Sequence, residues 1–485
     1  MATLATHGSG PLSGASNGAG RAVDLAVVGA GSAGFSAAIT AAKEGASVAL
    51  IGHGTIGGTC VNVGCVPSKT MIRAAEALHA ARAAGRFPGL AGEASMADWS
   101  ALVGAKDDLV ETLRAKKYVD LLADYPSMTY REAKASLGDD GLILDGGDPL
   151  RAGRIVIATG SRPALPDIPG IGDVPVLDST GALVLEEQPR SMIVMGGGYV
   201  GCELAQMFAR LGTEVTLVTR SQLLPEAEPE IAAALTDALR GEGVTVLTDL
   251  AYERIARDGG GVALTIMTGD GPRAIRASHA VAATGRRPNS DGMGLEAAGV
   301  TLDPRGGIAV DDRLRTSRKG TYAAGDVTGR DPFVYMAAYG AKLAALNALN
   351  GDAHAYLSDA MPWVVFTDPQ VAGVGLTEAA ARGRGHDVRT SVVPLTQVPR
   401  ALAARDTRGL VKLVAERGSD RILGAQIAAP EGADSIQTVV MAIKAGMTVK
   451  ALGETIFPYL TTVEAWKLAA QGFDQDVAKL SCCAG

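Results

Sequence analysis

Two stretches of the chain share one order of hydrophobic and polar positions. In the first, the apolar run Val23 to Val28 is followed by a glycine-rich turn, an alanine-rich segment and a second apolar run, Ser47 to Ile51. In the second, residues 191–220 (SMIVMGGGYVGCELAQMFARLGTEVTLVTR) repeat that order. Short apolar runs bounded by glycine predict buried strands, and the longer segments between them predict helices. Each stretch therefore predicts a strand–helix–strand unit of a parallel sheet.

Other apolar runs extend this pattern over the rest of the chain. RIVIATGSRP (154–163) and AVAATGRRPN (280–289) are predicted strands that end in glycine turns, and TYAAGDV (321–327) is a similar strand that ends in an acidic residue. From about residue 356 the glycine turns give way to alternating strands (PWVVF, LVKLVAE) and a helical stretch (DSIQTVVMAIKAG). We predict an α/β chain with a flexible tail at 1–21, two Rossmann-like domains at 22–160 and 161–290, a return to the first at 291–355, and a C-terminal α+β domain at 356–485.

Composition and charge exclude several classes of protein. The 485 residues hold 45 Lys and Arg against 52 Asp and Glu, a net charge of −7, which argues against a nucleic-acid binder because phosphate contacts require a basic surface. No apolar run approaches the ~18 residues that cross a bilayer, and residues 1–20 lack the charged and apolar regions of a secretory signal. Five cysteines are too few to staple a secreted chain of this size. We therefore expect a cytoplasmic protein.

The first glycine turn has the spacing of a dinucleotide-binding site. Gly29 permits the tight turn, Gly31 lets the backbone approach a pyrophosphate, and Gly34 allows the helix to pack closely on the strand. One feature departs from the rule, which expects a carboxylate about 20 residues later to hold a ribose. Neither Asp nor Glu occurs between Glu44 and Glu76, so we expect backbone or water to hold this ribose, or a weaker grip on it.

The second glycine turn, formed by Gly196, Gly198 and Gly201, has the same mechanics. The strand that follows ends in Arg220 rather than in an acid. A guanidinium suits a 2′-phosphate, which favours NADP over NAD. The alternative is that Arg220 is a solvated surface charge.

The segment GGTCVNVGCVPSK (57–69) carries two thiols, Cys60 and Cys65, that can close a small disulfide ring. A helical pattern follows from Pro67, so Cys65 lies near a helix N-terminus, where the thiolate is favoured and the pKa is lowered. A zinc site would need two more ligands, and no nearby Cys or paired His supplies them. We interpret the pair as a redox disulfide; two buried structural cysteines are the alternative.

This segment resembles the redox-active segment of the pyridine nucleotide-disulfide oxidoreductases, a family of FAD enzymes that includes glutathione and lipoamide members, and the likeness covers nearly the whole chain beyond residue 21. The resemblance implies two Rossmann-like dinucleotide-binding domains plus a C-terminal α+β dimerisation domain, with FAD on the first glycine turn and NADPH on the second. It also implies a homodimer.

The resemblance further assigns roles to individual residues. Cys65 would face the flavin, Cys60 would be the outer interchange thiol, and Lys69 would be a cation near flavin N5, paired with Glu203. Tyr199 would be the gate over the nicotinamide pocket, although Tyr199 and Glu203 could also be plain packing and surface residues. The remaining implied contacts are Gly58, Thr59, Thr159, Gly160 and Asp326 for FAD, the last through its ribityl chain, and Gly285 for NADPH.

The C-terminal region departs from the glutathione and lipoamide members. Those members carry a His-Pro-Thr segment, with a Glu five residues after the His, that protonates the leaving thiol. Here FPYLTTVE (457–464) has Tyr459 at the position of that His, and the last His in the chain is His386. A Tyr with a pKa of about 10 is poorly matched to proton transfer near neutral pH. Exchange with organic disulfides therefore lacks its proton carrier.

The chain ends SCCAG, and the adjacent Cys482 and Cys483 suit a soft metal ion better than a strained disulfide. FPYLTTVE, this terminus and PWVVFTDPQVAGVG together resemble the mercury(II)-reducing branch of the family. The hypothesis is NADPH-dependent reduction of Hg(II), presented as thiol complexes, to Hg(0). Cys60 and Cys65 would bind the metal, and the partner subunit's Cys482 and Cys483 would deliver it. Tyr459 and Tyr199 would border the metal site. Alternatives are a large thioredoxin-reductase-like disulfide reductase, a flavoprotein that sequesters mercury without turnover, and a tail with two incidental thiols.

Overall fold

The computed structural model describes residues 22–139, 141–147 and 149–480. Its first sheet has seven strands, and the two strands of the first predicted unit, β1 (Val23–Val28) and β2 (Val48–Gly52), are neighbours in it. The strand order is β3 (Met128–Glu132), β2, β1, β6 (Pro149–Ile157), β5 (Gly141–Leu144), β4 (Ala135–Gly138), with β17 (Thr321–Ala323) also paired to β6. β1 thus begins and ends where the pattern predicts, and β2 begins one residue later than predicted.

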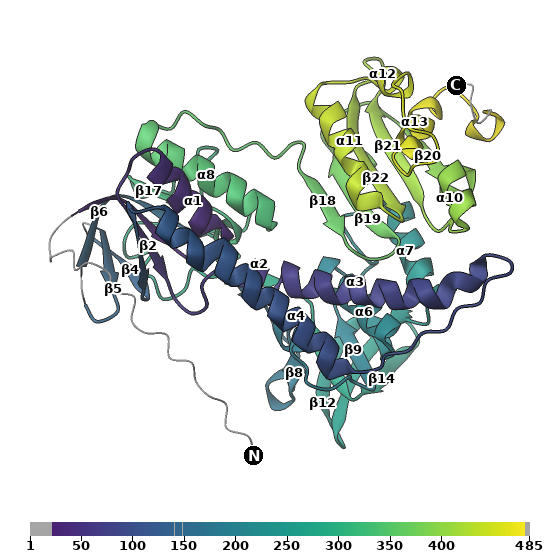
Figure 1. Cartoon of the computed structure of the whole chain (residues 1–485), viewed down its shortest axis with the longest axis horizontal. Coiled ribbons are helices and arrows are strands. Elements are labelled where there is room, and N and C mark those ends of the chain that lie inside the picture. Colours follow the sequence, from purple (N-terminus) through teal and green to yellow (C-terminus); the bar gives the residue numbers. More distant parts are fainter. Residues whose placement is uncertain (1–21, 140, 148, 481–485) are drawn as a thin grey trace.

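Two helices cover one face of this sheet. α1 (Ser32–Lys43) and α8 (Val334–Asn350) lie side by side in Figure 1, although about 300 residues separate them in the sequence. Their apolar residues share one core with β1 and β2. The chain therefore returns to the first sheet through β17 and α8, both within the stretch 291–355 predicted for this return.

The second sheet is parallel and carries the second predicted unit, β9 (Ser191–Met195), α6 (Tyr199–Leu211) and β10 (Glu214–Val218). Its order is β11 (Thr245–Leu247), β10, β9, β15 (His279–Ala282), β8 (Val176–Leu177), with α5 (Ser179–Leu183) and α7 (Pro229–Gly241) as flanking helices. An antiparallel meander, β12 (Ala251–Asp258), β13 (Gly261–Thr268) and β14 (Gly271–Ala277), packs on it. The hydrophobic pattern did not reveal this meander.

The chain passes between the two sheets twice, and the two crossings pair with each other. β7 (Ser161–Pro163) and β16 (Arg286–Pro288) form a separate antiparallel two-stranded sheet. They begin and end close to the predicted boundaries at 160 and 290. Those boundaries themselves stay predictions.

Helices after the cysteine segment also connect the two domains. α2 (Gly58–Val63) is followed by α3 (Cys65–Arg82), which contacts α6 of the second domain, and α4 (Trp99–Arg114) packs on α3. Figure 1 shows α3 and α4 extending from the first sheet toward the second. α3 begins at Cys65, two residues before the predicted Pro67. No described helix is both long and apolar enough to cross a membrane.

The C-terminal domain is an antiparallel sheet with helices packed on it. The order is β18 (Pro362–Val365), β19 (Gln370–Gly375), β22 (Ile422–Ala429), β21 (Leu410–Glu416), β20 (Val388–Pro394). The helices are α9 (Glu378–Gly383), α10 (Pro399–Ala404), α11 (Gly432–Lys444), α12 (Val449–Gly453) and α13 (Glu464–Gln471). Trp466 on α13 is fully buried in this core. The predicted α+β character of the domain is confirmed.

A buried ion network holds this domain against the second one. Arg210 of α6 bonds both carboxylate oxygens of Glu242 at 2.7 Å and an oxygen of Asp368 at 2.8 Å, while Arg408 of the C-terminal domain bonds Glu242 at 2.7 Å. The side chains of Arg210 and Glu242 are only 4% and 8% exposed. Buried charges of this kind are tolerated only when they are fully paired, so the network fixes how the two domains meet.

Candidate functional site

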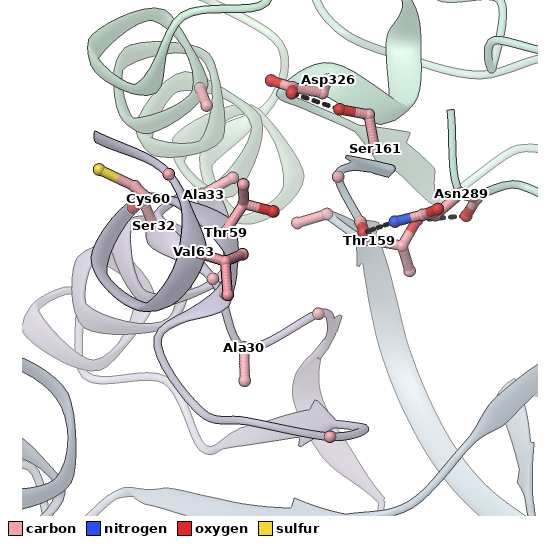
Figure 2. A pocket seen from close by; sticks show the side chains of 18 of the residues that line it. Ala30, Ser32, Ala33, Thr59, Cys60, Val63, Thr159, Ser161, Asn289 and Asp326 are labelled. Atoms are coloured by element: carbon pink, nitrogen blue, oxygen red, sulfur yellow. Dashed lines mark hydrogen bonds between the residues drawn. The ribbon is translucent and has the colours of Figure 1, made fainter. Parts of the chain in front are cut away.

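A cavity of about 660 Å³ lies at the carboxyl ends of β1 and β6. One wall comes from the first glycine turn and the cysteine segment, and the opposite wall from residues 158–161, 289–293 and 326 (Figure 2). The predicted residues that line it are Gly29, Gly31, Gly58, Thr59, Cys60, Cys65, Lys69, Thr159, Gly160, Glu203 and Asp326. The structure therefore brings together residues from five separate sequence segments.

The close-packing roles predicted for the glycines agree with the geometry of both turns. A Cβ on Gly34 would lie 1.7 Å from the carbonyl oxygen of Gly29, and one on Gly201 would lie 1.8 Å from that of Gly196. Neither side chain could be accommodated, so each helix packs directly on its turn. A Cβ on Gly198 would meet no atom within 4 Å, which leaves the backbone there open to a ligand.

At the end of the cavity next to Gly52, the last residue of β2, the packing leaves no room for a carboxylate side chain. A Cβ on Gly52 would lie 2.6 Å from the Cβ of Ala30 and 2.8 Å from the hydroxyl oxygen of Tyr130, so the phenol fills the space of a longer side chain. His53, Thr55 and Lys134 line this end instead. Tyr130 lies on β3 far along the chain, and no local signal in the sequence pointed to it.

Asp326 is held by a small polar cluster. The hydroxyl of Ser161 donates to Asp326 Oδ2 at 2.6 Å, and the guanidinium of Arg286 donates to the Ser161 hydroxyl at 2.8 Å. On the same wall Thr159 and Asn289 exchange two hydrogen bonds at 2.7 and 3.0 Å (Figure 2). The side chain of Asp326 is 23% exposed, so its carboxylate remains available to a polar ligand in the cavity.

Cys60 on α2 and Cys65 at the start of α3 are partly exposed free thiols on the cavity wall. The Cys60 thiol donates a hydrogen bond to the Cys65 sulfur, and this bond, opposed by burial and aided by the Lys69 ammonium, lowers the pKa of Cys65 to about 7. The same bond, with burial, raises the pKa of Cys60. Cys65 is therefore the thiolate of the pair near neutral pH, as its place at a helix N-terminus predicted.

Lys69 and Glu203 form the ion pair that the resemblance implied. Lys69 Nζ lies 2.6 Å from Glu203 Oε2, and the other Glu203 oxygen accepts the Phe366 backbone N–H at 2.9 Å. Lys69 Nζ also lies 4.8 Å from the centre of the Phe366 ring. Because Glu203 is buried, its full pairing keeps the ammonium in place beside the thiols. Phe366 belongs to the C-terminal domain and was not predicted.

Other predicted residues lie off the cavity. Tyr199 does not line it; its ring stacks on Trp363 and Phe333 instead. Arg220 is exposed at the end of β10, and Gly285 is exposed just before β16. Tyr459 is 47% exposed in the C-terminal domain and does not line the cavity of its own chain. Cys482 and Cys483 lie outside the described residues.

Two further phenols lie near the thiols. Tyr118, in the turn Ala115–Val119 that continues α4, has its hydroxyl 3.1 Å from that of Ser32; burial raises its pKa, with Cys60 and Cys65 adding to the effect. Burial likewise raises the pKa of Tyr335, with a smaller contribution from Cys65. Both come from segments far from the cysteines in sequence, so no motif could reveal them.

Cys202 has a structural role. It is fully buried on α6, and its thiol lies 3.5 Å from the Gly197 carbonyl oxygen. Burial raises its pKa, so it stays a thiol. Within the part of the chain that the structure describes, no group of three or more His, Cys, Asp or Glu side chains could hold a metal ion.

The cavity fits a flavin nucleotide. Its volume lies within the range of small-molecule and cofactor sites, roughly 300–1,000 Å³. At the first glycine turn, Gly29 and Gly31 line the cavity with backbone alone, so a ligand can approach the main chain closely. A Cβ on Gly160, another lining residue, would meet nothing within 4 Å. Asp326 offers a carboxylate acceptor on one wall of the cavity. Lys69 and the two thiols line the wall that faces it. The donor set therefore suits a diphosphate, a polyol chain and a redox-active ring next to sulfur.

Comparisons with known proteins extend over nearly the whole chain. A family model described as pyridine nucleotide-disulphide oxidoreductase matches residues 23–344, and the model of that family's dimerisation domain matches residues 361–470. Mercuric reductase of Streptomyces lividans is 48% identical over 467 residues, covering 95% of this chain and 98% of that protein. Mercuric reductase of Bacillus cereus is 45% identical over 463 residues, covering 95% and 73%.

Solved structures show the same architecture. The Cu(II) complex of the HOCl-induced flavoprotein disulfide reductase RclA from Escherichia coli is 30% identical, with a TM-score of 0.82, covering 93% of this chain and 99% of that one. The structure of RclA described without Cu(II) has a TM-score of 0.81 at 31% identity. The fold class predicted from the sequence is thereby confirmed.

Proposed function

This chain belongs to the pyridine nucleotide-disulphide oxidoreductase family, a flavin-dependent oxidoreductase with a dimerisation domain, and we propose that it uses FAD and NADPH to reduce Hg(II) to Hg(0). One observation carries the proposal: two free thiols, one with a pKa of about 7, lie on the wall of a flavin-sized cavity beside Lys69, which is paired with the buried Glu203. Paired thiolates select soft metal ions. The substrate is further supported by relatives named mercuric reductase.

The chemistry that bound FAD supplies is acceptance of a hydride from NADPH and delivery of electrons in pairs. One pair, together with the proton of the same hydride, opens the Cys60–Cys65 disulfide and leaves Cys65 as thiolate and Cys60 as thiol. Hg(II) then binds both sulfurs, and the Cys60 proton is released. A second pair reduces the bound ion to Hg(0), which departs and leaves both sulfurs free. Throughout, the ammonium of Lys69 stabilises negative charge on Cys65.

Delivery of the metal involves the second subunit in this proposal. We propose that Cys482 and Cys483 of the partner subunit take Hg(II) from solvent thiols and pass it to Cys60 and Cys65 by ligand exchange. Tyr459 of the partner subunit would border the metal during the transfer. The exposure of Tyr459 and its absence from the cavity of its own chain support this arrangement. So does Ile456, which is 95% exposed in the same segment of the dimerisation domain.

The choice of NADPH rests on Arg220. Its position two residues after the end of β10, close to where a carboxylate would select NAD, places a cation just beyond the strand that follows the second glycine turn. Replacing Arg220 by alanine should raise the half-saturating concentration of NADPH without changing that of NADH. An equal change for both nucleotides would assign Arg220 to the solvated surface.

The test of the proposed function compares substrates directly. NADPH oxidation is measured with HgCl2 in excess low-molecular-weight thiol, and separately with oxidised thioredoxin, glutathione and lipoamide. We expect turnover with Hg(II) and with none of the three organic disulfides, because Tyr459 occupies the position of the proton carrier that organic disulfides require. Turnover only with the organic disulfides would overturn the proposal in favour of a thioredoxin-reductase-like enzyme, whose terminal Cys pair would itself be a redox shuttle. Hg(II) binding without turnover would indicate a sequestering flavoprotein.

A shortened chain that ends at Leu480 tests the role of the terminal cysteines. We expect it to keep activity with Hg(II) presented on small thiols and to lose activity when Hg(II) is presented on bulky thiols. The matched control is the full chain with Cys482 and Cys483 both replaced by serine, which should behave like the shortened chain. Full activity of both variants on bulky thiols would remove the tail from the mechanism.

A further inference from the structure

Tyr199 is the middle ring of an aromatic stack that joins all three domains. Its centroid lies 5.5 Å from that of Trp363, with 18° between the ring planes, and 5.8 Å from that of Phe333, which in turn stacks on Tyr335. Trp363 belongs to β18 of the C-terminal domain, and Phe333 precedes α8 of the first domain. The ring of Tyr199 therefore fills the gap between the first and third domains.

The stack borders the cavity without lining it. Val200, Pro332 and Val334, the chain neighbours of Tyr199 and Phe333, are lining residues, whereas the stacked rings are not. Tyr199 is the first residue of α6, directly after the second glycine turn. In the proposed hydride path, a nicotinamide ring held at that turn reaches the cavity by displacing Tyr199 from its neighbours.

The position of Trp363 is fixed by the strand beneath it. In the β18–β19 pair Trp363 lies opposite Gly373, and a Cβ on that glycine would lie 2.5–2.8 Å from three atoms of the indole. The indole therefore lies flat over a strand position that only glycine leaves open, a known way for a large ring to pack against a sheet.

The backbone of β18 is also tied to the helix that carries Tyr199. Glu203, one turn after Tyr199 on α6, accepts the N–H of Phe366, three residues after Trp363. This hydrogen bond fixes α6 and β18 relative to each other next to the pair of Tyr199 and Trp363. The two rings meet because both backbones are fixed, and not through a chance contact of mobile side chains.

We propose that Trp363 is a positioning residue that holds Tyr199 in its closed place, so that the C-terminal domain sets how readily the nicotinamide ring enters. The inference rests on the proposed hydride path from NADPH. When binding requires a minor state, the apparent affinity falls in proportion to the population of that state. An aromatic pair shifts such a population by about two- to tenfold. Loosening the stack should therefore tighten the apparent binding of NADPH by that factor.

The experiment measures anaerobic reduction of the protein's flavin by NADPH in a stopped-flow instrument, without mercury. Trp363→Ala should lower the half-saturating NADPH concentration about two- to tenfold and leave the limiting rate within twofold. Trp363→Phe keeps a ring in the stack and should resemble the wild type. Gly373→Ala displaces the indole without deleting it and should shift NADPH in the same direction as Trp363→Ala, so a poorly folding alanine variant does not end the test.

A double-mutant cycle separates gating from direct contact with the nucleotide. In a Tyr199→Ala background, Trp363→Ala should have no further effect, because no gate remains to be held. If the same substitution still changes NADPH binding there, or raises the half-saturating concentration in the wild-type background, Trp363 contacts the nicotinamide itself and the proposal fails. An unchanged half-saturation in all three single variants, Trp363→Ala, Trp363→Phe and Gly373→Ala, also refutes it.

Tryptophan fluorescence provides a readout that does not depend on turnover. The chain has three tryptophans; Trp99 and Trp466 are 9% and 0% exposed, so Trp363 is the one placed to respond at the gate. NADP⁺ titrated into the oxidised protein should change the fluorescence, and Trp363→Phe should abolish the change. A protein that reduces its flavin with NADPH but not Hg(II) would refute the proposed substrate and leave this inference standing. No reduction of the flavin by NADPH would refute both.

Discussion

Replacing Cys60 by alanine removes the hydrogen-bond donor that most lowers the pKa of Cys65. With the donor present that pKa is about 7, against an ordinary value of 9.0. At pH 7 the first value leaves about half of Cys65 as thiolate, and the second leaves about 1%. Without Cys60 the burial of Cys65 still raises its pKa, and only Lys69 among the side chains still lowers it. We expect the pKa of Cys65 to return to the ordinary range or above it.

In the Cys60→Ala variant, the smaller thiolate fraction lowers the reaction rate of Cys65, whereas the greater nucleophilicity of the remaining thiolate raises it. The thiolate fraction at pH 7 falls about 50-fold, while each thiolate becomes about six- to tenfold more reactive because its pKa is about two units higher. The net rate of reaction with an aromatic disulfide reagent should therefore fall about five- to eightfold at pH 7. At a pH above both pKa values the alanine variant should react faster than the parent.

Cys60→Ser is the matched control, because a hydroxyl keeps a donor next to the Cys65 sulfur while removing the second thiol. The assay follows the rate against pH in a chain whose Cys482 and Cys483 are serines. Cys202 stays silent because it is fully buried. The serine variant should show its inflection at a lower pH than the alanine variant. Identical inflections in the two variants would show that the Cys60 hydrogen bond does not set the acidity of Cys65.

Two further pairs of substitutions test the packing that positions the site. Glu242→Ala deprives the buried guanidinium group of Arg210 and the half-buried one of Arg408 of their shared carboxylate, and should cost about 3–5 kcal/mol of unfolding free energy, measured by denaturant titration of the holoenzyme. The control Glu454→Ala breaks the pair of Lys450 and Glu454, whose side chains are 77% and 68% exposed, and should cost less than about 0.5 kcal/mol. Equal losses of unfolding free energy in the Glu242 and Glu454 variants would contradict the role of burial. Gly201→Ala pushes a methyl group against the carbonyl oxygen of Gly196 and should abolish the binding of NADP⁺, measured by calorimetry. In the control Gly198→Ala the methyl group enters open space, so this variant should bind NADP⁺ more weakly with little loss of stability. Normal NADP⁺ binding by the Gly201 variant would refute the packing argument.

The sequence predicted the parts of the site that depend on local rules. The glycine turns follow from the contacts between a turn and the helix after it. A lowered pKa of Cys65 was predicted from its helix N-terminus; the direction agrees, but in the structure the hydrogen bond from Cys60 is the main cause. The ion pair of Lys69 with Glu203, implied by the family resemblance, is confirmed at 2.6 Å. Each of these depends either on neighbours within one strand–helix unit or on a motif that recurs in the family.

The parts that sequence did not predict depend on contacts between distant segments. Tyr130 fills the space above Gly52, Phe366 orients Glu203, and Tyr118 lies beside the thiols, yet none of them belongs to a motif. The missing ribose carboxylate could be noticed in the sequence, but the phenol that takes its place could be found only in the folded chain. The domain boundaries, the nicotinamide specificity and the delivery of metal by the terminal cysteines stay predictions.

The release of mercury vapour tests the central claim most directly. HgCl2 in excess thiol is incubated with the holoenzyme and NADPH in a sealed vessel, and the Hg(0) carried off in a gas stream is measured against the NADPH consumed. The account predicts one Hg(0) for each NADPH, and no release by a Cys65→Ser variant that still reduces its flavin. Consumption of NADPH without Hg(0), or undiminished release by the Cys65→Ser variant, would contradict it.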